Sequence, residues 1–507
     1  MGELVHQLLE RNAAKYPGVQ AVRWPQGDVT LNWYQLNAEA NCLARYLQAQ
    51  NFRANDRAAL FISNRPEFII GYFAVLKAGG TVTPLNVKFT PTEIAYILQD
   101  SEISVIIYED ALRTVVEEAT KNIPRVKTIS THEMAGLKEK FEDQNLDLPL
   151  NPFNLAEILY TSGTTGKPKG VMLTHNAVTM VAIMMAYEAD IYFGDRCLHL
   201  MPLTHSAPLN LMMVGGTWAG ATHVLGNFTP QAMLELTERE RTTHFFGAPV
   251  AYNLAARLPN FSQYDLTSAR RWIYGGAPMP KAGLDNMMKL FPGGFMGVYG
   301  LTEAGPNGTA LHPHEHPHFA GSIGCRGSVT TEVRVVNAGG KDVSPGEIGE
   351  IIIKTPSNMI GYLNRPQDTA EILVNGWIYT GDLAERDEYG YIWIKDRKKD
   401  MIITGGVNVY PKEVEDVLSL YPGIADAAVV GIPHPDWGET VMALVVPMPE
   451  HQMQPEEIRQ FCKRHLAEYK VPRIIQFTDS IPRNASGKIL KHIIKEKYSN
   501  TAIIPLT

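Results

Sequence analysis

The chain has 507 residues, more than one hydrophobic core usually supports, so at least two domains are expected. Hydrophobic residues make up 45% and charged residues 20%, which fits a folded globular protein and excludes a disordered or fibrous one. The net charge of -7 disfavours nucleic acid as a partner, and four cysteines without a CxxC pair indicate neither disulfides nor a thiolate zinc site.

The first predicted element is an amphipathic helix over Met1–Tyr16. This segment lacks the basic start and apolar run of a secretory signal, so a cytoplasmic protein is expected. The sequence contains no stretch of about 20 apolar residues, so we expect no membrane span. Neither a heptad pattern nor an apolar seam favours one oligomeric state, and a monomer and a homodimer both stay open.

Two stretches, residues 31–178 and 195–299, alternate helical patterns with short apolar strands bounded by Gly, Pro or Asp. This alternation predicts α/β layers, with ligand-binding loops where strands end. The predicted strands are Ala58–Ile62, Thr81–Pro84, Ser104–Tyr108, Cys197–Met201, His244–Gly247 and Arg271–Tyr274.

From residue 321 to 393 the pattern changes to short β-type runs, which predicts a small β-rich subdomain with strands at Glu332–Val336, Gly349–Lys354 and Tyr391–Ile394. Six consecutive charged residues, Lys395–Asp400, predict an exposed linker. We place the domain boundary there, between an N-terminal domain of residues 1–398 and a mobile α+β C-terminal domain of residues 399–507. The latter should contain helices from Pro411 and over Pro455–Leu466, and strands at Ala427–Val430 and Val441–Val446.

Four alternating histidines follow the second α/β stretch, at His312, His314, His316 and His318. Such a cluster can bind a metal ion, but interleaved prolines in a surface loop favour the reading without a metal.

The strongest local signal is the loop Tyr160-Thr161-Ser162-Gly163-Thr164-Thr165-Gly166-Lys167-Pro168-Lys169-Gly170, which follows an apolar strand. Glycines let backbone N–H groups approach an anion, while hydroxyls add donors and lysines add positive charge. The loop therefore predicts a polyphosphate site. It is not a Walker A loop, because Pro168 follows the Gly-Lys pair where Ser or Thr would be required.

This loop resembles the phosphate-loop signature of the adenylate-forming enzymes, the superfamily of acyl-CoA synthetases, nonribosomal adenylation domains and beetle luciferases. Further motifs similar to those of this superfamily follow in the same order over essentially the whole chain: Tyr274–Pro278, Tyr299–Glu303, Tyr379–Asp382, Lys395–Asp400, Gly405–Pro411 and Ser486–Lys488. The chain is most similar to a bacterial-type fatty-acid–CoA ligase.

The resemblance implies an ATP site formed by Thr161 to Lys167 together with residues of the later motifs. Small residues at Gly276, Ala277 and Pro278 would let adenine approach, with Tyr299 stacking on it and Gly300 beside it. Thr302 offers a hydroxyl to phosphate, and Glu303 offers the carboxylate oxygen that Mg²⁺ prefers. Asp382 would accept the ribose hydroxyls, and Arg397 would add a further hydrogen bond.

The resemblance also assigns catalytic and hinge residues in the C-terminal domain. Lys488 would bridge the substrate carboxylate and the α-phosphate as negative charge builds up in the transition state. A rotation about Lys399 would then replace this lysine with Gly405 and Gly406, past which the pantetheine arm enters, with Asn408 nearby.

The acyl pocket is expected to use mostly apolar or small segments, with His205 beside the carboxylate and counted among the catalytic residues with Lys488, Glu303 and Thr302. The other predicted lining residues are Ser206, Asn210, Tyr252, Gly275, Gly300 and Leu301. Residues 203–209 contain no aspartate to pair with an α-ammonium, which disfavours an amino acid substrate. The segments expected to line the pocket, residues 202–210, 247–252, 275–276 and 300–306, contain no arginine, which disfavours a dicarboxylate substrate.

The expected reaction converts a carboxylic acid and ATP to acyl-AMP and pyrophosphate, and then transfers the acyl group to coenzyme A. A medium- or long-chain fatty acid or an alicyclic acid is favoured, and an aryl acid is the alternative. Residues 402–411 continue directly from the hinge without the insertion of ligases that load carrier proteins, so coenzyme A is the favoured acceptor and a carrier protein the alternative. A luciferase would share the motifs, but no distinctive residue supports that activity.

Overall fold

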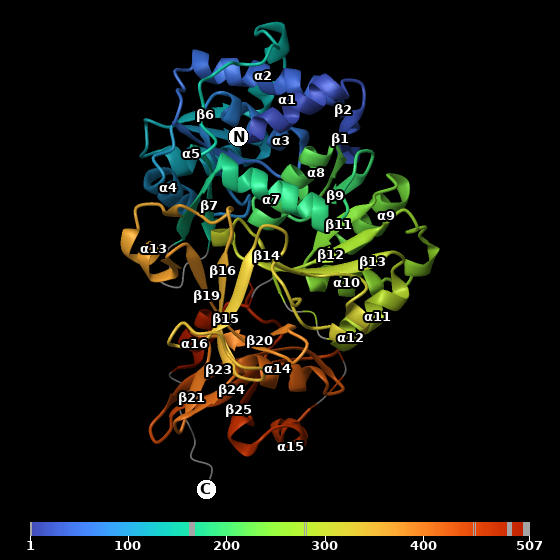
Figure 1. Ribbon diagram of the computed structural model, residues 1–507, viewed down its shortest axis with the longest axis vertical. Helices are drawn as coiled ribbons and strands as arrows, with labels where there is room; N and C mark the ends of the chain where they lie inside the picture. Colours follow the sequence, from blue (N-terminus) through green and yellow to red (C-terminus); the bar gives the residue numbers. More distant parts are fainter. Residues whose placement is uncertain are drawn as a thin grey trace. The chain divides into compact units, whose positions relative to one another are not determined.

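The computed structural model describes residues 3–161, 168–277, 279, 281–449, 451, 453–483 and 489–499. Its first mostly parallel sheet (Figure 1) has the strand order β17-β8-β7-β4-β3-β5-β6. The bounds are β3 Arg57–Phe61, β4 Thr81–Pro84, β5 Val105–Tyr108, β6 Lys127–Ser130, β7 Leu155–Thr161, β8 Lys169–Thr174 and β17 Gly361–Tyr362. The pairs β7–β8 and β8–β17 are antiparallel, so the strand direction alternates at this edge of the sheet.

Helices cover both faces of this sheet. Successive side chains of a strand point to opposite sides, and the apolar side chains on each side pack against a separate layer of helices. Ala58 and Leu60 of β3 join a core cluster with the first helices, whereas Ala59 and Phe61 join a cluster with α4 and α5. The helices are α1 Val5–Lys15, α2 Trp33–Ala49, α3 Pro66–Lys77, α4 Pro91–Asp100, α5 Arg113–Thr120 and α6 Thr131–Met134.

A second sheet has the order β14-β13-β12-β11-β9-β10-β1-β2 and is parallel from β13 to β1. Its strands are β1 Gln20–Trp24, β2 Val29–Asn32, β9 Arg196–His199, β10 Thr222–Leu225, β11 His244–Gly247, β12 Arg271–Tyr274, β13 Gly294–Gly300 and β14 Gly308–Leu311. Its helices are α7 His175–Glu188, a π-helix Ala207–Val214, α8 Gly215–Ala219, α9 Pro230–Arg239, α10 Pro249–Ala256, α11 Lys281–Leu290 and α12 His316–Phe319.

A third sheet, rich in short strands, has the order β15-β16-β19-β18, with β20 pairing with β19. Its bounds are β15 Glu332–Val336, β16 Ile348–Lys354, β18 Leu373–Val374, β19 Trp377–Arg386 and β20 Ile392–Arg397. Helix α13, Pro366–Ile372, lies between β17 and β18 in the chain.

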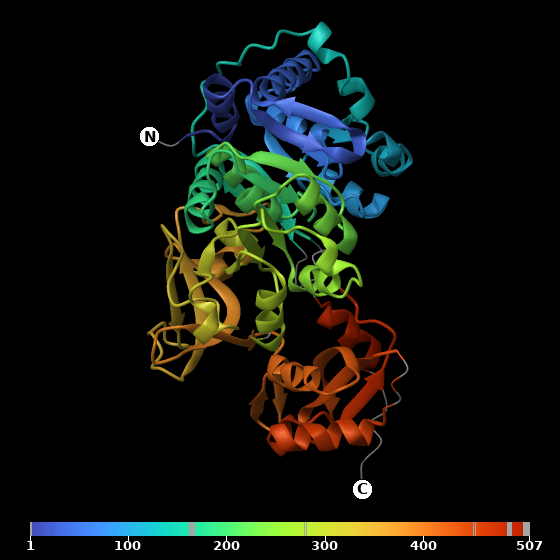
Figure 2. The ribbon, with the colours of Figure 1, turned by 90° about the vertical axis from the view of Figure 1, so that its right-hand side faces the viewer.

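The C-terminal sheet has the order β22-β21-β24-β23, with β25 on β24 (orange to red in Figure 2). Val429 of β23 packs with α14 and α15 on one face, while Val430 packs with α16 on the other. The bounds are β21 Ile402–Thr404, β22 Val407–Val409, α14 Pro411–Ser419, β23 Ile424–His434, β24 Gly438–Pro447, α15 Pro455–His465, β25 Ile474–Phe477 and α16 Lys491–Tyr498.

The chain divides into two compact units. One comprises Met1–Ala320, Arg326–Val333 and Ile353–Tyr379, and the other comprises Gly321–Cys325, Arg334–Ile352 and Thr380–Thr507. We call them the large and the small unit. The predicted boundary after residue 398 stays a prediction.

The predicted fold class is confirmed, with α/β layers, a β-rich part and a smaller C-terminal α+β part. The linker prediction at Lys395–Asp400 is wrong for its first half, because residues 395–397 belong to β20. Asp396 is buried there and accepts hydrogen bonds from the backbone amides of Arg397, at 2.7 Å, and Lys412, at 2.8 Å. A run of charges therefore does not exclude a strand when backbone donors satisfy its buried carboxylate.

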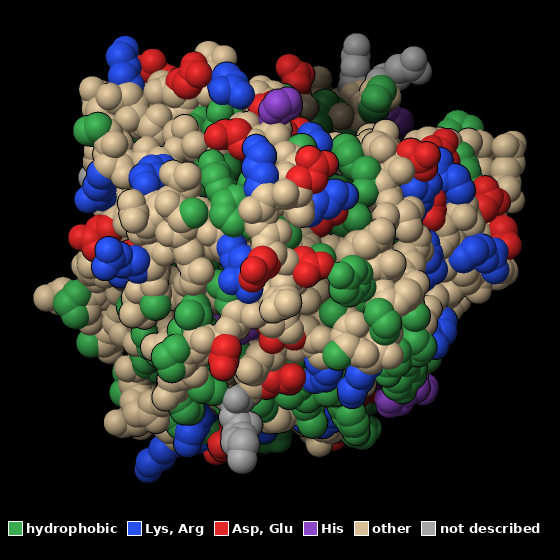
Figure 3. All heavy atoms as spheres, turned by 90° about the horizontal axis from the view of Figure 1, so that it is seen from above, with side chains coloured by type: hydrophobic (Ala, Val, Ile, Leu, Met, Phe, Trp, Pro, Cys, Tyr) green, Lys and Arg blue, Asp and Glu red, His purple; other side chains and the backbone are tan. Residues whose placement is uncertain are grey.

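None of the helices in the described ranges is long and apolar enough to cross a membrane. The face in Figure 3 carries acidic and basic side chains interspersed with apolar ones, without a field of one sign.

Candidate active site

The flanks of the predicted phosphate loop lie on two adjacent antiparallel strands. Thr161 ends β7 and pairs with Lys169, the first residue of β8. Residues 162–167 lie outside the described residues, so the roles predicted for Ser162 to Lys167 stay predictions. Lys169 forms an ion pair with Asp368 at 2.9 Å, with only 13% of the lysine side chain exposed, so this lysine is held by the protein itself.

Two strands of the second sheet, β12 and β13, end near the predicted adenine and phosphate residues. β12 and β13 are parallel, with Tyr274 beside Gly297. Gly275–Ala277 follow β12, while Tyr299 and Gly300 end β13 and Leu301–Glu303 follow it, so both groups lie where neighbouring strands end, at the same edge of the sheet. Ligands of α/β sheets bind at such an edge. A Cβ at Gly300 would lie 2.3 Å from the Pro306 carbonyl oxygen, so this turn requires glycine. Pro278 lies outside the described residues.

Thr302 and Glu303 occupy a short 3₁₀ turn, Thr302–Ala304, directly after β13. The Thr302 hydroxyl lies 2.9 Å from that of Ser206, which joins this turn to the predicted acyl-pocket segment. Oε1 of Glu303 accepts a 2.6 Å hydrogen bond from the hydroxyl of Tyr362. Burial and the Glu303 carboxylate raise the pKa of Tyr362 far above its usual value, so its hydroxyl stays protonated as a donor.

His205 is the predicted acyl-site residue with the most distinctive environment. Burial lowers the pKa of its imidazole, so the ring is neutral at neutral pH. Within the described part of the chain, its Nε2 is buried without a hydrogen-bond partner. An orphaned polar atom in a buried position is costly unless a ligand or water completes it.

Asn210 and Tyr252 make internal contacts instead. The Asn210 amide donates to the buried Glu157 carboxylate at 2.9 Å, and the Tyr252 hydroxyl donates to the Ile273 carbonyl at 2.6 Å. Both side chains are fully buried. Gly275 and Leu301 flank the strand ends of the second sheet. The acyl-pocket roles of all four residues stay predictions.

The predicted ribose residues lie together in the small unit. Asp382 on β19 pairs in register with Arg397 on β20, and the Arg397 Nε donates to the carboxylate at 3.0 Å. The backbone amide of Asp382 donates to the Thr380 hydroxyl at 3.1 Å, which fixes the strand at this position. The arginine therefore orients the carboxylate, whose second oxygen has the capacity to accept further bonds.

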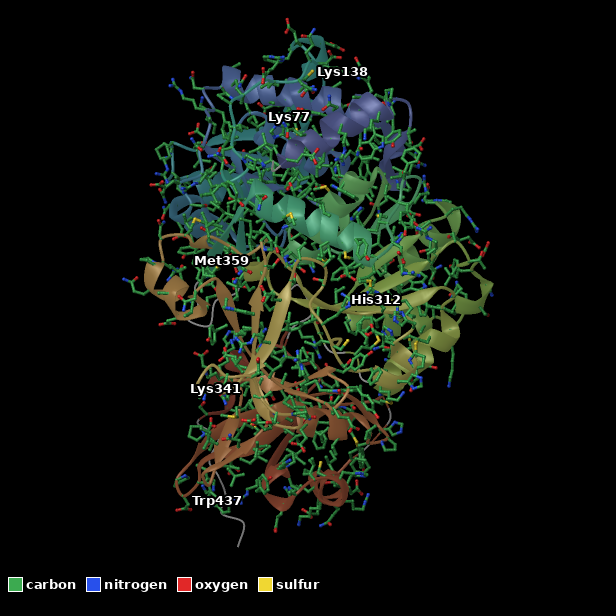
Figure 4. All side chains as sticks on the ribbon, viewed as in Figure 1. Lys77, Lys138, His312, Lys341, Met359 and Trp437 are labelled. Atoms are coloured by element: carbon green, nitrogen blue, oxygen red, sulfur yellow. The ribbon has the colours of Figure 1, made fainter. Side chains whose placement is uncertain are left out.

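The predicted hinge residue and the residues predicted to admit the pantetheine arm lie on either side of β21. Lys399 lies in the turn of residues 398–400 after β20. Gly405 and Gly406 form the turn between β21 and β22, with φ values of +57° and +81°, the conformation of a tight two-residue hairpin that favours glycine. Gly405 donates its amide to the carbonyl of Trp437 at 2.9 Å (Trp437 is labelled in Figure 4), and Asn408 is exposed on β22.

Lys488 lies outside the described residues, and the segments on either side of it are well anchored. Arg483 and Ile489 form an antiparallel bridge. Arg483 also forms an ion pair with Asp426 at 2.8 Å, and Lys491 forms one with Glu415 at 2.9 Å.

The histidine cluster makes structural contacts. His312 lies 2.9 Å from the Glu188 carboxylate, and His316 contacts the Tyr274 hydroxyl at 3.2 Å. Among the described residues, no group of three or more His, Cys, Asp or Glu side chains is arranged to hold a metal ion.

Tyr362 is the residue that sequence reasoning missed. It lies 59 positions from Glu303 in a two-residue strand, and no local spacing relates the two. The only sequence signal is its place after Gly361 in the short apolar stretch Met359–Leu363.

Comparison with known proteins places these motifs in a family. Residues 9–363 match the family described as AMP-binding enzyme, and residues 413–488 match the AMP-binding enzyme C-terminal domain. A feruloyl-CoA synthase of Amycolatopsis sp is 38% identical over 494 residues, 96% of this chain and 98% of the relative. The long-chain-fatty-acid–CoA ligase FadD13 of Mycobacterium tuberculosis is 35% identical over 502 residues, 97% of this chain and 98% of that protein.

A solved structure of ATP-bound MatB from Rhodopseudomonas palustris superimposes with a TM-score of 0.90 at 28% identity, covering 99% of both chains. The likeness therefore extends over both units of the fold and over nearly the full length of the relatives.

Proposed function

This chain belongs to the AMP-binding enzyme family and is an AMP-forming acyl-CoA ligase, and we propose that its acid is a monocarboxylate with an extended apolar body. A medium- or long-chain fatty acid or an alicyclic acid is the first candidate. The second is an aryl acid whose carboxyl group ends an extended arm, which the 38% identity to a feruloyl-CoA synthase favours.

The observation that carries this proposal is the lack of cationic residues in the segments predicted to line the acyl site beside the phosphate-side turn. Ser206 and Thr302 are hydrogen-bonded at 2.9 Å, which ties the segment beginning at His205 to the turn that carries Glu303. Residues 202–210, 247–252 and 300–306 contain neither lysine nor arginine, so a second carboxylate would find no cationic partner in them.

In the first half-reaction, an oxygen of the acid attacks the α-phosphorus of ATP, and pyrophosphate leaves. Thr302 and the donors of residues 161–167 would hold the phosphates, while Asp382, oriented by Arg397, would accept the ribose hydroxyls. Lys488 would stabilise the charge that develops between the carboxylate and the α-phosphate.

Glu303 fits a role as ligand of Mg²⁺, the ion expected to accompany ATP. Its carboxylate is fixed through one oxygen by Tyr362, and its remaining lone pairs are the hard oxygen donors that this ion prefers. A bound Mg²⁺ would neutralise charge on the leaving pyrophosphate.

In the second half-reaction, the thiol of coenzyme A gives up its proton and attacks the acyl carbonyl carbon, and AMP leaves. The hairpin turn of Gly405 and Gly406 offers the small surface that a pantetheine arm requires. Rotation about Lys399 would exchange this turn for Lys488 between the two half-reactions.

The test is pyrophosphate release with ATP and a panel of acids, each with and without coenzyme A. The panel contains acetate, hexanoate, decanoate, palmitate, cyclohexanecarboxylate, benzoate, ferulate, succinate and phenylalanine. We expect an extended monocarboxylate to give the highest rate and its CoA thioester to accumulate.

Two variants sharpen this test. Asp382→Asn should lower release with every acid in the same proportion, because ribose binding does not depend on the acid. His205→Ala should instead change the order of preference among the acids. A best rate with succinate or phenylalanine would refute the proposed acid class. Pyrophosphate release without formation of a CoA thioester would indicate that the acyl acceptor is a carrier protein and not coenzyme A.

A further inference from the structure

One segment of the large unit, residues 355–363, contacts both the Glu303 turn and the strand that leaves the phosphate loop. We call it the brace. The brace runs from the end of β16 through β17, and Met359, labelled in Figure 4, lies near its middle. None of the sequence motifs falls within it.

The first half of the brace holds the 302–305 turn through backbone and side-chain bonds. The Ser357 hydroxyl donates to the Ala304 carbonyl at 2.8 Å, and the Met359 amide donates to the Glu303 carbonyl at 2.8 Å. The Asn307 amide donates to the Thr355 hydroxyl at 3.2 Å. These bonds fix the backbone of the predicted metal ligand.

The second half of the brace pairs with β8, the strand that follows the phosphate loop. Gly361 and Tyr362 lie opposite Met172 and Val171, and the Leu363 amide donates to the Gly170 carbonyl at 2.8 Å. One short segment therefore sets the spacing between the Glu303 turn and the start of β8.

The Tyr362 side chain makes the same connection. Its hydroxyl donates to Oε1 of Glu303 at 2.6 Å, and its ring lies under the ammonium of Lys169, with 5.2 Å between the Lys169 Nζ and the ring centroid. The Lys169 Nζ also pairs with Asp368 at 2.9 Å. Tyr362 is 9% exposed and Glu303 is half-buried, so this hydroxyl–carboxylate bond is partly shielded from bulk water, which strengthens it.

We propose that Tyr362 is a positioning residue that holds the Glu303 carboxylate in the orientation required to bind the metal–nucleotide substrate. This inference rests on the proposed role of Glu303. A glutamate side chain has several accessible rotamers, and a hydrogen bond to one oxygen selects one of them and directs the other oxygen to the cation. Without the hydroxyl, the carboxylate must be ordered when the substrate binds.

The test measures metal binding directly, without turnover. Free Mn²⁺ is titrated by electron paramagnetic resonance in the presence of enzyme and α,β-methylene-ATP, which cannot be cleaved at the reacting bond. Tyr362→Phe keeps the ring and removes the hydroxyl, and we expect it to weaken Mn²⁺ binding in this complex by about tenfold, the effect of losing one hydrogen bond to a charged group.

Tyr34→Phe is the matched control, because the Tyr34 hydroxyl donates to the Asp143 carboxylate at 2.7 Å without touching any predicted site residue. It should leave Mn²⁺ affinity unchanged. Glu303→Gln should weaken Mn²⁺ binding more than Tyr362→Phe, and adding Tyr362→Phe to Glu303→Gln should cause no further loss. Thermal unfolding of each variant checks that the fold is retained.

Three results would overturn the proposal in distinguishable ways. Unchanged Mn²⁺ affinity in Tyr362→Phe, with weakened binding in Glu303→Gln, would leave the metal role of Glu303 intact and make Tyr362 merely structural. Equal losses in Tyr362→Phe and Tyr34→Phe would point to general loosening of the fold. Unchanged affinity in Glu303→Gln would remove the metal role of Glu303 and the inference that rests on it.

Discussion

Glu157 is a buried carboxyl group that is held in the core by hydrogen bonds from two other side chains. It is fully buried on β7, four positions before the end of that strand, and accepts hydrogen bonds from the Tyr72 hydroxyl at 2.6 Å and the Asn210 amide at 2.9 Å. Asn210 belongs to the π-helix that continues from His205 and Ser206. One carboxyl group thus links the strand before the phosphate loop to the acyl-side segment.

Glu157 makes stability dependent on pH. Burial raises its pKa from 4.5 to about 7, although both hydrogen bonds lower it in part. Between these pH values the folded chain keeps a proton that the unfolded chain releases, so the contribution of Glu157 to stability is most favourable below pH 4.5 and falls as the pH rises to about 7.

Glu157→Gln removes this titration. Because a neutral amide avoids the cost of a buried charge, we expect it to raise the apparent unfolding midpoint at pH 8 by roughly 3 °C relative to wild type. The difference between the two proteins should shrink towards pH 5. Thermal unfolding at pH 5, 6, 7 and 8 measures it, and a constant offset at every pH would contradict the assignment.

At this scale the sequence predicts residue types better than their partners. The motif Tyr299–Glu303 predicts roles for Thr302 and Glu303, and the structure places both residues in one turn, with the Thr302 hydroxyl 2.9 Å from that of Ser206. Tyr362 was missed because its bond to Glu303 joins residues distant in the chain, and such pairs follow from strand pairing rather than from local spacing.

Elements of the small unit converge on a partly buried ion network close in sequence to the predicted catalytic Lys488. Lys491, the first residue of α16, pairs with Glu415 of α14 at 2.9 Å, and Glu415 also accepts a bond from the Val429 amide of β23 at 2.8 Å. Burial lowers the pKa of Lys491, but Glu415 and Asp396 outweigh it and raise the pKa overall, so the side chain stays charged. The network fixes α16 three residues after Lys488.

Lys491→Met removes the charge and leaves Glu415 and Asp396 without their cation. We expect it to destabilise the small unit by about 2 kcal/mol, between the losses for an exposed and for a fully buried ion pair, because both side chains are partly buried. The matched control is Lys412→Met, because Lys412 pairs with Asp416 at 3.0 Å within one helix at the surface, a contact that contributes less than about 1 kcal/mol. Urea unfolding followed by a probe in the small unit measures both losses, and equal losses would contradict a stabilising role of the network.

Among the elements, strands bounded by glycine, proline or acidic residues were predicted most accurately. The predicted bounds at Thr81–Pro84, His244–Gly247, Arg271–Tyr274 and Glu332–Val336 are those of β4, β11, β12 and β15. The charged run Lys395–Asp400 led to a wrong linker prediction because Asp396 is buried and accepts hydrogen bonds from two backbone amides. Composition alone does not reveal such a tertiary contact.

At the scale of the whole molecule, the order of motifs along the chain was sufficient to predict the fold class and the reaction. Length, charge and the α/β alternation alone gave two domains and ligand loops at strand ends, but no chemistry. The acid remains the least predictable feature, because it depends on the depth of a pocket whose lining comes from segments far apart in the sequence.

If a rotation about Lys399 replaces Lys488 between the two half-reactions, Lys488→Ala should affect the first half-reaction and not the second. We expect adenylation to fall by roughly a hundredfold or more, because a transition-state charge contact of about 3 kcal/mol is lost. Thiol transfer from preformed acyl-adenylate should be largely spared, since Lys488 acts only in the first step. Rapid-quench assays of each half-reaction measure the two rates, and equal losses would contradict the scheme.

The most direct test of the central claim follows oxygen atoms through the reaction. The best acid of the panel is prepared with oxygen-18 in its carboxyl group and converted to its CoA thioester with unlabelled ATP. If the acid attacks the α-phosphorus, one labelled oxygen stays on the phosphate when the thiol releases AMP, so mass spectrometry will find AMP with one oxygen-18 atom. Label in inorganic phosphate with formation of ADP, or unlabelled AMP, would contradict an acyl-adenylate intermediate.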